Sequence, residues 1–545
     1  MFVNFADLPE KRALLLDFYY DFENVEKFGL KNFRDIDAIA EQIERTAATE
    51  FPHRIKLVEM IKSQYDGFSE SQRTKKNINS LLSPKTFAVV TAQQIGLFGG
   101  PLQYFYKIIT TIKLAEKLGN IFEDYNFVPV FWLESEDHGF ETAHKIYTYN
   151  YDKAVRKIAY EDGLPPEENR GSVGELNLGE GIRNALSELK KTLKRNENTD
   201  ELLALFSKTF VEGEKFKTAF RRLLFELFDE RGLVIFDGNC REAKLLVKDL
   251  FRKAITDYEE LAISGIRRSA LLETEYHAHV KIHPVNLYFL DGDERRRIEP
   301  HERGFKIGTK RKVWSEKELL ELLESAPELF SPDVILRPIV QDYIFPSALI
   351  VAGPNEINYF PQVIPYYEAF AVRTPLLYPR VSITINEEYL QKKIEKYNIA
   401  PTEIFTMDER ALVDKILFND DEHDLERLFA ESAADIDYTM DKLSERLATL
   451  DSKLKTAADD VKHGIAELLG ILSAKAKEAN SVNEQNVLRH VKTLKNQFLP
   501  NGKLQEDVIN FAYFANQYGL DFLNTIFAEA AINRFEHQII TLGKK

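Results

Sequence analysis

Cysteine is almost absent from this sequence of 545 residues, in which Cys240 is the single one. One thiol excludes a disulfide framework within the chain and a zinc site built from several cysteines. A lone cysteine usually packs as a small apolar side chain, whereas a nucleophilic one needs a special charged environment. The sequence therefore predicts no disulfide and no thiol catalysis, and it assigns no role to Cys240.

Long apolar runs and long basic runs are also missing. No stretch approaches the ~18 consecutive apolar residues that cross a bilayer, and residues 1–10 lack the layout of a signal peptide. We therefore expect a cytoplasmic protein with no membrane partner. The formal net charge is −15, and binding along a nucleic-acid backbone requires clustered Lys and Arg. No nucleic-acid partner is expected, although a single nucleotide needs only a local site.

The chain does contain enough apolar sequence for a large core. Hydrophobic residues make up 44% of it, and 545 residues exceed one ordinary domain. We predict four parts, namely a helical segment over 1–80, a core over 81–385, a helical hairpin over 386–500, and helices over 501–545 that return to the core. Helical or hairpin insertions into the core are expected at about 151–230 and about 262–335.

Four short apolar runs are typical of buried strands. They cover residues 87–90, 128–133, 233–236 and 349–352. Between the first two, Pro101 suits the first position of an amphipathic helix whose apolar face runs from Tyr104 to Leu118. A strand, a helix and a strand within about 47 residues form a βαβ unit, which predicts an α/β fold with a parallel sheet.

The C-terminal third carries apolar residues at alternating spacings of four and three, which is the pattern of a coiled coil. The seam consists of Ile436, Met440, Leu443, Leu447, Leu450, Leu454, Ala457 and Val461. We expect a helical hairpin that turns near residues 455–460, with a second helix that ends at about Phe498, before Pro500-Asn501-Gly502. The pattern leaves open whether the seam pairs within one chain or between two.

Polar clusters follow three of the predicted strands, at the edge where an open parallel sheet binds ligands. The first comprises Gln93, Gln94, Gly96, Gly99 and Gly100, and it leads into the helix that starts at Pro101. A helix start presents free N–H groups and partial positive charge, which suit a phosphate or a carboxylate. The alternative is a tight turn that needs glycine for its backbone angles. Another cluster runs from Gly353 to Glu356.

The remaining cluster is Glu136, Asp137 and His138. These residue types suit metal binding, acid–base chemistry or capping of the next helix, and the alternatives stay open because neighbouring side chains point in different directions.

A second group of histidines, His277, His279 and His283, precedes a predicted hairpin. In that hairpin, residues 285–290 and 295–298 flank Asp291-Gly292-Asp293. Alternation along a strand would place His277 and His279 on one face, which would allow a zinc site. Polar contacts near a cleft are the favoured interpretation, and no metal site is predicted.

Two arginines are candidates for binding acidic groups. Arg337 lies in the segment L-R-P-I-V-Q-D-Y with Gln341 and Asp342, and its fork suits a carboxylate or phosphate. A structural salt bridge is the alternative. Arg380 is followed two residues later by the hydroxyl of Ser382. The sequence contains no Gly-x-Ser-x-Gly elbow, and its glycine loop is neither a GxGxxG fingerprint nor a P-loop.

Taken together, these motifs resemble one known family. V-T-A-Q-Q-x-G-L-F-G-G-P-L, F-W-x-x-S-E-D-H, L-R-P-x-x-Q-D-Y, A-G-P-x-E-I-x-Y-F and P-R-x-S occur in this order, and L-P-N-G-K-L-Q-E follows near the end. They are similar to the bacillithiol biosynthesis cysteine-adding enzyme over nearly the whole chain. The sequence departs from the family pattern at Ala92, where glycine is expected, and at Gly139, where an acidic residue is common.

The resemblance implies a ligase that joins L-cysteine to glucosaminyl-malate. It implies a Rossmann-like core related to class I aminoacyl-tRNA synthetases, and a C-terminal antiparallel coiled coil that supports a homodimer. ATP is the expected cosubstrate, with Mg²⁺ only as its companion. The catalytic candidates are Glu136, Asp137, His138 and Arg337. The candidates for substrate or nucleotide binding are Gln93, Gln94, Gly96, Gly99, Gly100, Tyr104, Lys107, Gln341, Asp342, Tyr343, Gly353, Glu356, Tyr359, Arg380 and Ser382.

Two alternatives stay beside this hypothesis. One is a different amide-forming ligase or nucleotidyltransferase on the same core, and the other is a coiled-coil scaffold that binds a nucleotide without turnover. The sequence leaves open whether activation proceeds by adenylation and which group is the catalytic base.

Overall fold

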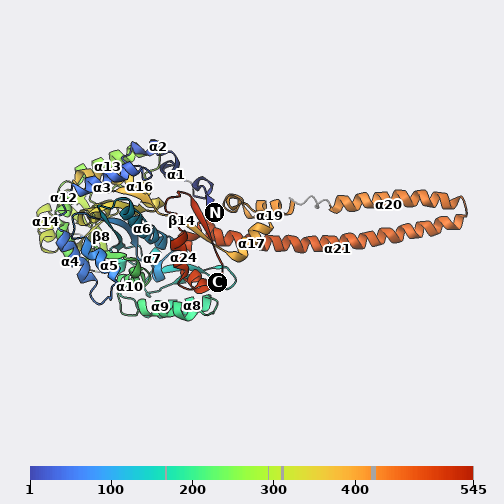
Figure 1. Cartoon of the computed structure of the whole chain (residues 1–545), viewed down its shortest axis with the longest axis horizontal. Coiled ribbons are helices and arrows are strands. Elements are labelled where there is room, and N and C mark those ends of the chain that lie inside the picture. The colour runs from blue at the N-terminus through green and yellow to red at the C-terminus, as the bar shows by residue number, and fades with distance from the viewer. Residues whose placement is uncertain (11, 166–167, 293, 309–311, 419–424, 544–545) are drawn as a thin grey trace. The chain divides into compact units, whose positions relative to one another are not determined.

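In the computed structural model the chain forms two units (Figure 1). The structure describes residues 1–545 except 11, 166–167, 293, 309–311, 419–424 and 544–545. The first unit comprises residues 1–385 with 500–540, and the second comprises 386–499 with 541–543. None of the helices in the described part of the chain is both long and apolar enough to cross a membrane.

A parallel sheet of five strands forms the centre of the first unit, in the order β13-β12-β2-β3-β6. The strands are β2 (Thr86–Gln94), β3 (Asn126–Glu134), β6 (Val234–Asp237), β12 (Ser347–Ala352) and β13 (Leu376–Pro379). All four pairs are parallel, and β2 and β3 are in register from Thr86 opposite Asn126 to Gln94 opposite Glu134. The predicted α/β fold with a Rossmann-like parallel sheet is confirmed. The order places a switch point between β12 and β2, where ligand sites form in such sheets.

Helix α6 (Leu102–Ile121) connects β2 to β3 and completes the predicted βαβ unit. It starts one residue later than predicted, because Pro101 is still extended, with φ −74° and ψ 160°. The prediction of an amphipathic helix was wrong, since α6 is buried on most sides. The additional cover comes from remote segments, as the Phe105 ring lies 4.6 Å from that of Phe511 and 5.9 Å from that of Phe228.

The helices predicted within residues 1–80 are present. They are α1 (Ala13–Tyr20), α2 (Glu23–Glu26), α3 (Ile36–Ala47), α4 (Arg54–Gln64) and α5 (Gln72–Ser80). Ile39 and Ile43 of α3 are buried, whereas Ile36 at the start of that helix is 46% exposed.

The segment between β3 and β12 contains two groups of elements. The first has the antiparallel pair β4 (Lys145–Tyr149) and β5 (Val155–Ala159), followed by α8 (Gly181–Thr192), α9 (Thr199–Thr209) and α10 (Phe216–Phe228). After β6 come α11 (Arg241–Leu246), α12 (Lys248–Thr256) and α13 (Tyr258–Leu272).

The second group is an antiparallel sheet of five strands in the order β10-β9-β8-β7-β11. It comprises β7 (Leu287–Asp291), β8 (Glu294–His301), β9 (Gly304–Ile307), β10 (Val313–Trp314) and β11 (Phe330–Pro332), with α14 (Glu316–Ser325) before β11. The predicted hairpin is confirmed, because Asp291 pairs with Glu294 and Gly292 has φ 63°. Asp293 of the predicted turn lies outside the described residues.

The prediction of a strand through His277 and His279 was wrong, because no strand is assigned between α13 and β7 in the described residues. The two rings do meet edge to face, with centroids 5.4 Å apart. The described side chains include no cluster of three or more His, Cys, Asp or Glu that could hold a metal ion. The zinc interpretation therefore has no geometric support.

Helices from two parts of the chain complete the first unit. They are α15 (Leu336–Ile344), α16 (Pro354–Ala369), α22 (Gln505–Val508), α23 (Ala512–Tyr518) and α24 (Phe522–Glu529). A small sheet has the order β1-β15-β14, from β1 (Phe2–Val3), β15 (His537–Leu542) and β14 (Ser382–Glu387). Helices were predicted after residue 501 and are present, but the final strand β15 was not predicted.

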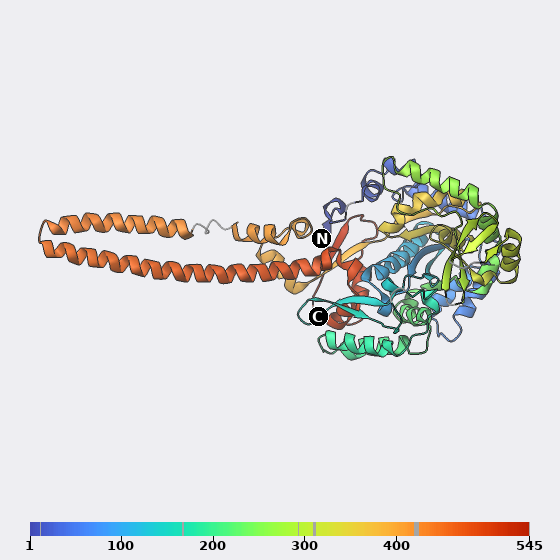
Figure 2. The same cartoon turned by 180° about the vertical axis from the view of Figure 1, so that it is seen from behind.

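The second unit is helical and contains the predicted hairpin (Figure 2). Its helices are α17 (Glu388–Lys396), α18 (Pro401–Thr406), α19 (Glu409–Phe418), α20 (Leu425–Ala448) and α21 (Ser452–Phe498). The second long helix ends at Phe498 as predicted. The predicted turn at 455–460 was wrong, because the chain reverses between Ala448 and Ser452, where the Asp451 side chain accepts a hydrogen bond of 2.8 Å from the Lys453 N–H.

The earlier turn changes which side chains meet inside the hairpin. Met440 and Ala458 are buried, and the Ser444 hydroxyl donates a 3.0 Å hydrogen bond to Asp459. Several members of the predicted seam are exposed instead, namely Leu443, Leu450, Leu454 and Val461. These four residues do not form the internal contact of the hairpin.

Candidate active site

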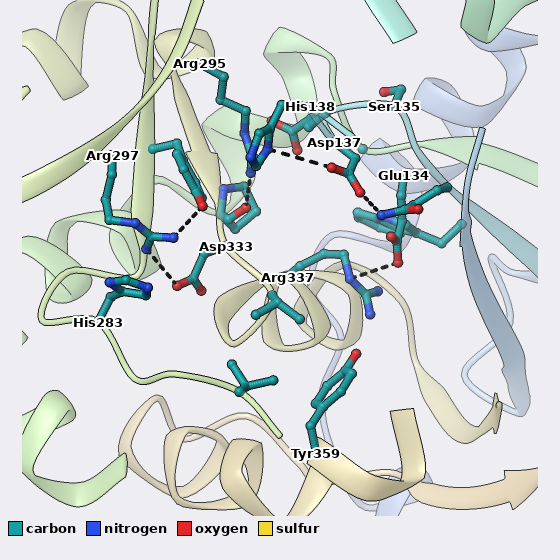
Figure 3. Close-up of a pocket in the computed structure, with 18 of the residues that line it drawn as sticks. Glu134, Ser135, Asp137, His138, His283, Arg295, Arg297, Asp333, Arg337 and Tyr359 are labelled. Atoms are coloured by element: carbon teal, nitrogen blue, oxygen red, sulfur yellow. Dashed lines mark hydrogen bonds and ion pairs between the residues drawn. The ribbon is translucent and has the colours of Figure 1, made fainter. Parts of the chain in front are cut away.

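A cleft of about 410 Å³ lies beyond the carboxyl ends of the parallel strands (Figure 3). Its floor is formed by the ends of β2, β3 and β6, and one side by α15 and α16. The antiparallel sheet and the segment before it form the facing side. Its polar lining consists of Gln94, Glu134, Ser135, Glu136, Asp137, His138, His279, Lys281, His283, Tyr288, Arg295, Arg297, Asp333, Arg337 and Tyr359.

Glu134 and Arg337 form an ion pair on the side of the cleft next to the switch point. Their atoms Oε1 and Nε are 3.1 Å apart. Arg337 is held on the first turn of α15, whose N–H groups at Ile335 and Leu336 donate to Asp333 at 2.9 and 3.1 Å. Burial raises the pKa of Glu134 despite the neighbouring guanidinium, which lowers it. The salt bridge that was the alternative for Arg337 is therefore present, and it lines the cleft.

Asp137 is a carboxylate in the cleft without a strong cation beside it. Gln94 donates a hydrogen bond to one of its oxygens, and the Gly139 N–H donates to the other at 2.9 Å. Among the described residues no Lys or Arg nitrogen lies within 4.0 Å of it, and the His138 ring nitrogen Nδ1 is 3.7 Å away. Its side chain is 25% exposed. The negative charge of Asp137 is therefore available to a bound cation.

Glu136 differs from its neighbour, because it is paired with a buried lysine. Lys244 of α11 is 2% exposed, donates to the Glu136 carboxylate and donates to the Phe330 carbonyl oxygen at 3.0 Å. The charge of Glu136 is neutralised within the protein, so a role in anchoring the wall fits it better than a role in catalysis.

The opposite wall is cationic. Arg295 is 8% exposed and donates to the Ser331 hydroxyl at 2.9 Å, to the Pro332 carbonyl at 2.7 Å and to His138 Nδ1 at 3.0 Å. Among the described residues no carboxylate oxygen lies within 4.0 Å of its nitrogens. Arg295 therefore carries a buried positive charge that no carboxylate of the described residues neutralises.

Tyr288 lies between Arg295 and a second guanidinium. The Arg295 and Arg297 guanidinium carbons are 3.9 and 4.4 Å from the centre of its ring, distances typical of cation–π contacts. Arg297 also donates to the Tyr288 hydroxyl, and its NH1 is 3.6 Å from an oxygen of Asp333. This stack fixes both arginines before any ligand arrives.

The loop at residues 171–174, in the first insertion, is hydrogen-bonded to the backbone that follows β3. The Val173 N–H donates to the Asp137 carbonyl at 2.7 Å, and the Gly174 N–H donates to the Ser135 carbonyl at 3.0 Å. A Cβ on Gly174 would lie 2.5 Å from that carbonyl oxygen, so this close approach requires glycine. The Ser135 hydroxyl donates to Asp237 at 2.5 Å, which joins β3 to β6.

The glycine loop after β2 does not line this cleft. Gly99 and Gly100 have φ 90° and 69° and are buried. A Cβ on Gly100 would lie 2.6 Å from the Tyr104 ring. The start of α6 is occupied by the chain itself, because the Leu102 N–H donates to the Ile509 carbonyl at 2.9 Å. The loop therefore has the geometry of the tight turn that was the alternative, and its predicted binding of an anion has no support from the contacts.

The other predicted binding residues also lie outside the cleft lining, with the exceptions of Gln94 and Tyr359. They engage one another or remote parts of the chain. Lys107 Nζ is 2.5 Å from Glu356 and donates to the Ala92 carbonyl, while Glu356 accepts from the Gly353 N–H at 2.7 Å. These contacts close the switch point between β12 and β2.

The predicted binding residues at 341–343 and at 380 and 382 also form their contacts within the protein. Gln341 donates to Asp342 at 3.0 Å, Asp342 accepts from Tyr367, and the Tyr343 ring lies 4.9 Å from that of His53. Burial raises the pKa of Asp342 to about 6.

Arg380 and Ser382 both donate to Glu506, at 2.9 and 2.7 Å. Gln93 and Gly96 complete the set outside the lining, and Gln93 hydrogen-bonds to Tyr104.

Comparison with known proteins identifies the family. A family model described as the bacillithiol biosynthesis BshC N-terminal Rossmann-like domain matches residues 1–381, and its companion, the C-terminal coiled-coil domain, matches residues 383–542. The chain belongs to the BshC family.

Relatives in this family cover most of the chain. A protein named "Putative cysteine ligase BshC" from Salinibacter ruber is 31% identical over 97% of this chain and 96% of its own length. Proteins of the same name from Chloroherpeton thalassium and Flavobacterium johnsoniae are 30% and 29% identical, over 91% and 97% of this chain and 89% and 97% of their own lengths. The Rossmann-like core and coiled coil implied by the resemblance are therefore confirmed.

The likeness to aminoacyl-tRNA synthetases stays a prediction. A solved structure described as a putative arginyl-tRNA synthetase from Campylobacter jejuni covers 85% of this chain and 100% of its own, at 10% identity and a TM-score of 0.22. An overlap of that quality carries no weight for the fold.

Several cleft residues of this BshC family member were missed by the sequence analysis. They are Glu134, Tyr288, Arg295, Arg297 and Lys281. The signal was the Arg-Arg-Arg run of the predicted hairpin, in which alternation directs Arg295 and Arg297 to one face. The sequence does not indicate that this hairpin folds over the end of β3.

Proposed function

We propose that this chain is a cytoplasmic ligase of bacillithiol biosynthesis that forms an amide between the carboxyl group of L-cysteine and the amino group of glucosaminyl-malate. Membership of the BshC family supports the class of reaction. The relatives' name supports cysteine as a substrate.

The observation that carries the proposal is the presence of two unneutralised opposite charges in one cleft. Asp137 lacks a Lys or Arg partner and Arg295 lacks a carboxylate partner among the described residues. Both substrates of this reaction carry an amino group and at least one carboxylate. Asp137 is suited to the ammonium group of cysteine, and Arg295 with Arg297 is suited to the malyl carboxylates.

The chemistry requires activation of the cysteine carboxyl group, because hydroxide is a poor leaving group. ATP is the expected source of that activation, with transfer of a phosphoryl or adenylyl group to the carboxylate. The amine of glucosaminyl-malate then attacks the activated carbonyl carbon, the C–N bond forms, the phosphate or AMP leaves, and the amine loses a proton. Within the cleft, the arginine wall suits the developing negative charge on the departing group.

We also propose a homodimer that forms through the hairpin of α20 and α21. Its exposed apolar residues include Leu443, Leu450, Leu454, Val461 and Leu468, whose exposed fractions range from 41% to 76%. A row of apolar side chains of this kind on a heptad spacing is typical of a helical interface.

The proposal is tested with purified full-length chain, L-cysteine, glucosaminyl-malate and Mg-ATP, by mass detection of the cysteinyl product. Removing one charge from a buried pair at an interface costs about 2–5 kcal/mol, or roughly 30- to 5,000-fold. We expect Asp137→Asn to raise the KM for cysteine by about 100-fold and Arg295→Met to raise the KM for glucosaminyl-malate by a similar factor.

Glu141→Gln is the matched control, since this exposed carboxylate close to Asp137 pairs with Lys145 outside the cleft. Its KM values are expected to be unchanged. Turnover of another amino acid in preference to cysteine would favour a different ligase. The absence of any turnover by a folded wild-type chain with these substrates would favour a nucleotide-binding scaffold.

A further inference from the structure

The contact between Arg295 and His138 determines which ring nitrogen of His138 carries the proton. Arg295 NH1 and His138 Nδ1 are 3.0 Å apart. A guanidinium has only donors, so Nδ1 must be the acceptor. An imidazole that accepts at Nδ1 is neutral and carries its single proton on Nε2.

Arg295 has little freedom to abandon this contact. Its Nε and NH2 groups donate to Ser331 and Pro332, and its guanidinium is stacked on Tyr288. With 8% of its surface exposed, it is held by β8 and by the end of β11. The arrangement does not depend on a ligand, because every partner is part of the protein.

Burial and the two nearby guanidinium groups also favour the neutral form of His138. Its pKa is lowered first by burial, then by Arg295 and also by Arg297, while Asp137 at 3.7 Å raises it. These three are the charged groups that face the ring from β8 and from the end of β3. The side chain is half-exposed and lines the cleft, and Nε2 has no hydrogen-bond partner among the described residues.

We propose that Arg295 is a positioning residue that holds His138 as the neutral Nε2–H tautomer, so that His138 offers a hydrogen-bond donor to an anionic carboxylate or phosphate oxygen bound in the cleft. This tautomer has no free nitrogen lone pair, so His138 is neither a general base nor a metal ligand in this arrangement. The identity of the recipient oxygen rests on the proposed ligase function, whereas the tautomer does not.

The first test is nitrogen-15 NMR of the histidine rings in the full-length protein, with the His138 signals assigned by their loss in His138→Gln. We expect a neutral ring at pH 7 with a protonated Nε2 and an acceptor Nδ1. In Arg295→Met the donor and the charge are lost while Asp137 remains, so the titration midpoint of His138 should rise by about one pH unit.

Arg296→Met is the matched control, because Arg296 is the next residue of β8 and pairs with Glu294. It should leave the His138 midpoint unchanged. A protonated His138 or an Nδ1–H tautomer in the wild type at pH 7 would overturn the proposal even if Arg295→Met did not fold. An unchanged midpoint in a folded Arg295→Met variant would also overturn it.

The second test separates donation from proton abstraction in the assay. Glutamine can place an N–H near the position of Nε2, whereas alanine cannot. Loss of one preorganised donor costs about 10²- to 10³-fold in kcat. His138→Ala should lose about 100-fold, and His138→Gln should stay within about ten-fold of the wild type.

Equal loss in the two His138 variants would contradict the donor role. A wild-type chain that makes no amide at all would contradict the proposed function, but the NMR result would still determine the tautomer of His138.

Discussion

At the scale of single residues, Glu136 and Asp137 show how neighbouring carboxylates acquire different roles. Asp137 faces the cleft with neutral donors, Gln94 and the Gly139 N–H, on its oxygens and with His138 nearby. Glu136 turns towards the buried Lys244. The difference arises from the end of β3, where the chain leaves the sheet and successive side chains diverge. One carboxylate is thus available to a ligand, and the other is part of the scaffold.

Lys244 should be more important for stability than for turnover. Replacing Lys244 by Met leaves Glu136 without its cation, and breaking such a buried pair lowers the free energy of unfolding by about 3–5 kcal/mol. Lys244→Met combined with Glu136→Gln should recover most of this loss, because no charge is then left unpaired. Urea unfolding measures both variants.

The control is Lys248→Met, since Lys248 forms its ion pair with Glu324 at the surface. A surface pair contributes about 0–1 kcal/mol. Equal destabilisation by Lys244→Met and Lys248→Met would contradict the anchoring role of Lys244.

His537 should make stability depend on pH. It is fully buried between the hydroxyls of Ser382 and Thr384, and burial lowers its pKa to about 4. Between pH 6.5 and 4 the unfolded chain binds a proton that the folded chain does not, so the free energy of unfolding falls as the pH falls through this window. The full effect is about 3 kcal/mol.

The measurement is the free energy of unfolding in urea at several values between pH 7.5 and pH 4.5. His537→Asn should be less stable than the wild type at pH 7.5. The difference between their free energies of unfolding should become smaller towards pH 4.5. His463→Asn removes an exposed histidine and should keep a constant difference. A constant difference for His537→Asn would show that His537 is not held neutral.

The residue types of the site were predictable, but their pairing was not. The motif S-E-D-H gave Glu136, Asp137 and His138 as candidates, and all three line the cleft. Nothing near them in sequence indicates Lys244 or Arg295, which come from helices and strands more than a hundred residues away. A charge can be read from a sequence, but whether it is neutralised depends on tertiary contacts.

At the scale of elements, the loop at residues 171–174 holds the carboxyl end of β3, which lines the cleft. Gly174→Ala would place a methyl group 2.5 Å from the Ser135 carbonyl and should displace that strand end. Overpacking of this kind costs about 1–3 kcal/mol, and the displacement of Asp137 should lower kcat/KM at least about ten-fold. Thermal unfolding and the amide-forming assay measure the two effects.

Gly179→Ala is the matched control, because the nearest atom to its added Cβ is the Tyr160 hydroxyl oxygen at 3.6 Å. It should retain activity. Full activity in Gly174→Ala would show that the loop does not position Asp137.

The glycine loop after β2 shows that the order of elements can be predicted from the sequence, whereas their burial cannot. The order of strand, loop and helix over residues 86–121 was predictable from hydrophobic runs and Pro101. The loop's surroundings were not, because the cover over the start of α6 comes from Ile509 and Asn510, about four hundred residues later. A local pattern identified a helix start but not its burial.

At the scale of the whole molecule, the heptad pattern predicted a helical hairpin correctly but placed its turn wrongly. The turn falls at Asp451 because an aspartate there caps α21. Since the seam continued through the turn, spacing alone could not locate it. The consequence is that part of the seam faces outward, which is the basis for the proposed dimer.

The dimer should depend on these outward residues. Leu454→Glu combined with Val461→Glu and Leu468→Glu places charges on the exposed row and should convert a dimer into a monomer, as measured by sedimentation velocity. Circular dichroism checks that the helices persist. Lys453→Glu with Lys475→Glu changes exposed polar positions and should leave the dimer intact. A wild-type chain that sediments as a monomer at micromolar concentration would contradict the proposal.

The unneutralised charges of Asp137 and Arg295 should be complementary to the charged groups of the substrates. The most direct measurement is a crystal structure of the protein with L-cysteine and glucosaminyl-malate bound. We expect the cysteine ammonium group within hydrogen-bonding distance of Asp137 and a malyl carboxylate within that distance of Arg295 or Arg297. Both substrates bound away from the cleft, with Asp137 and Arg295 in contact with neither, would contradict it.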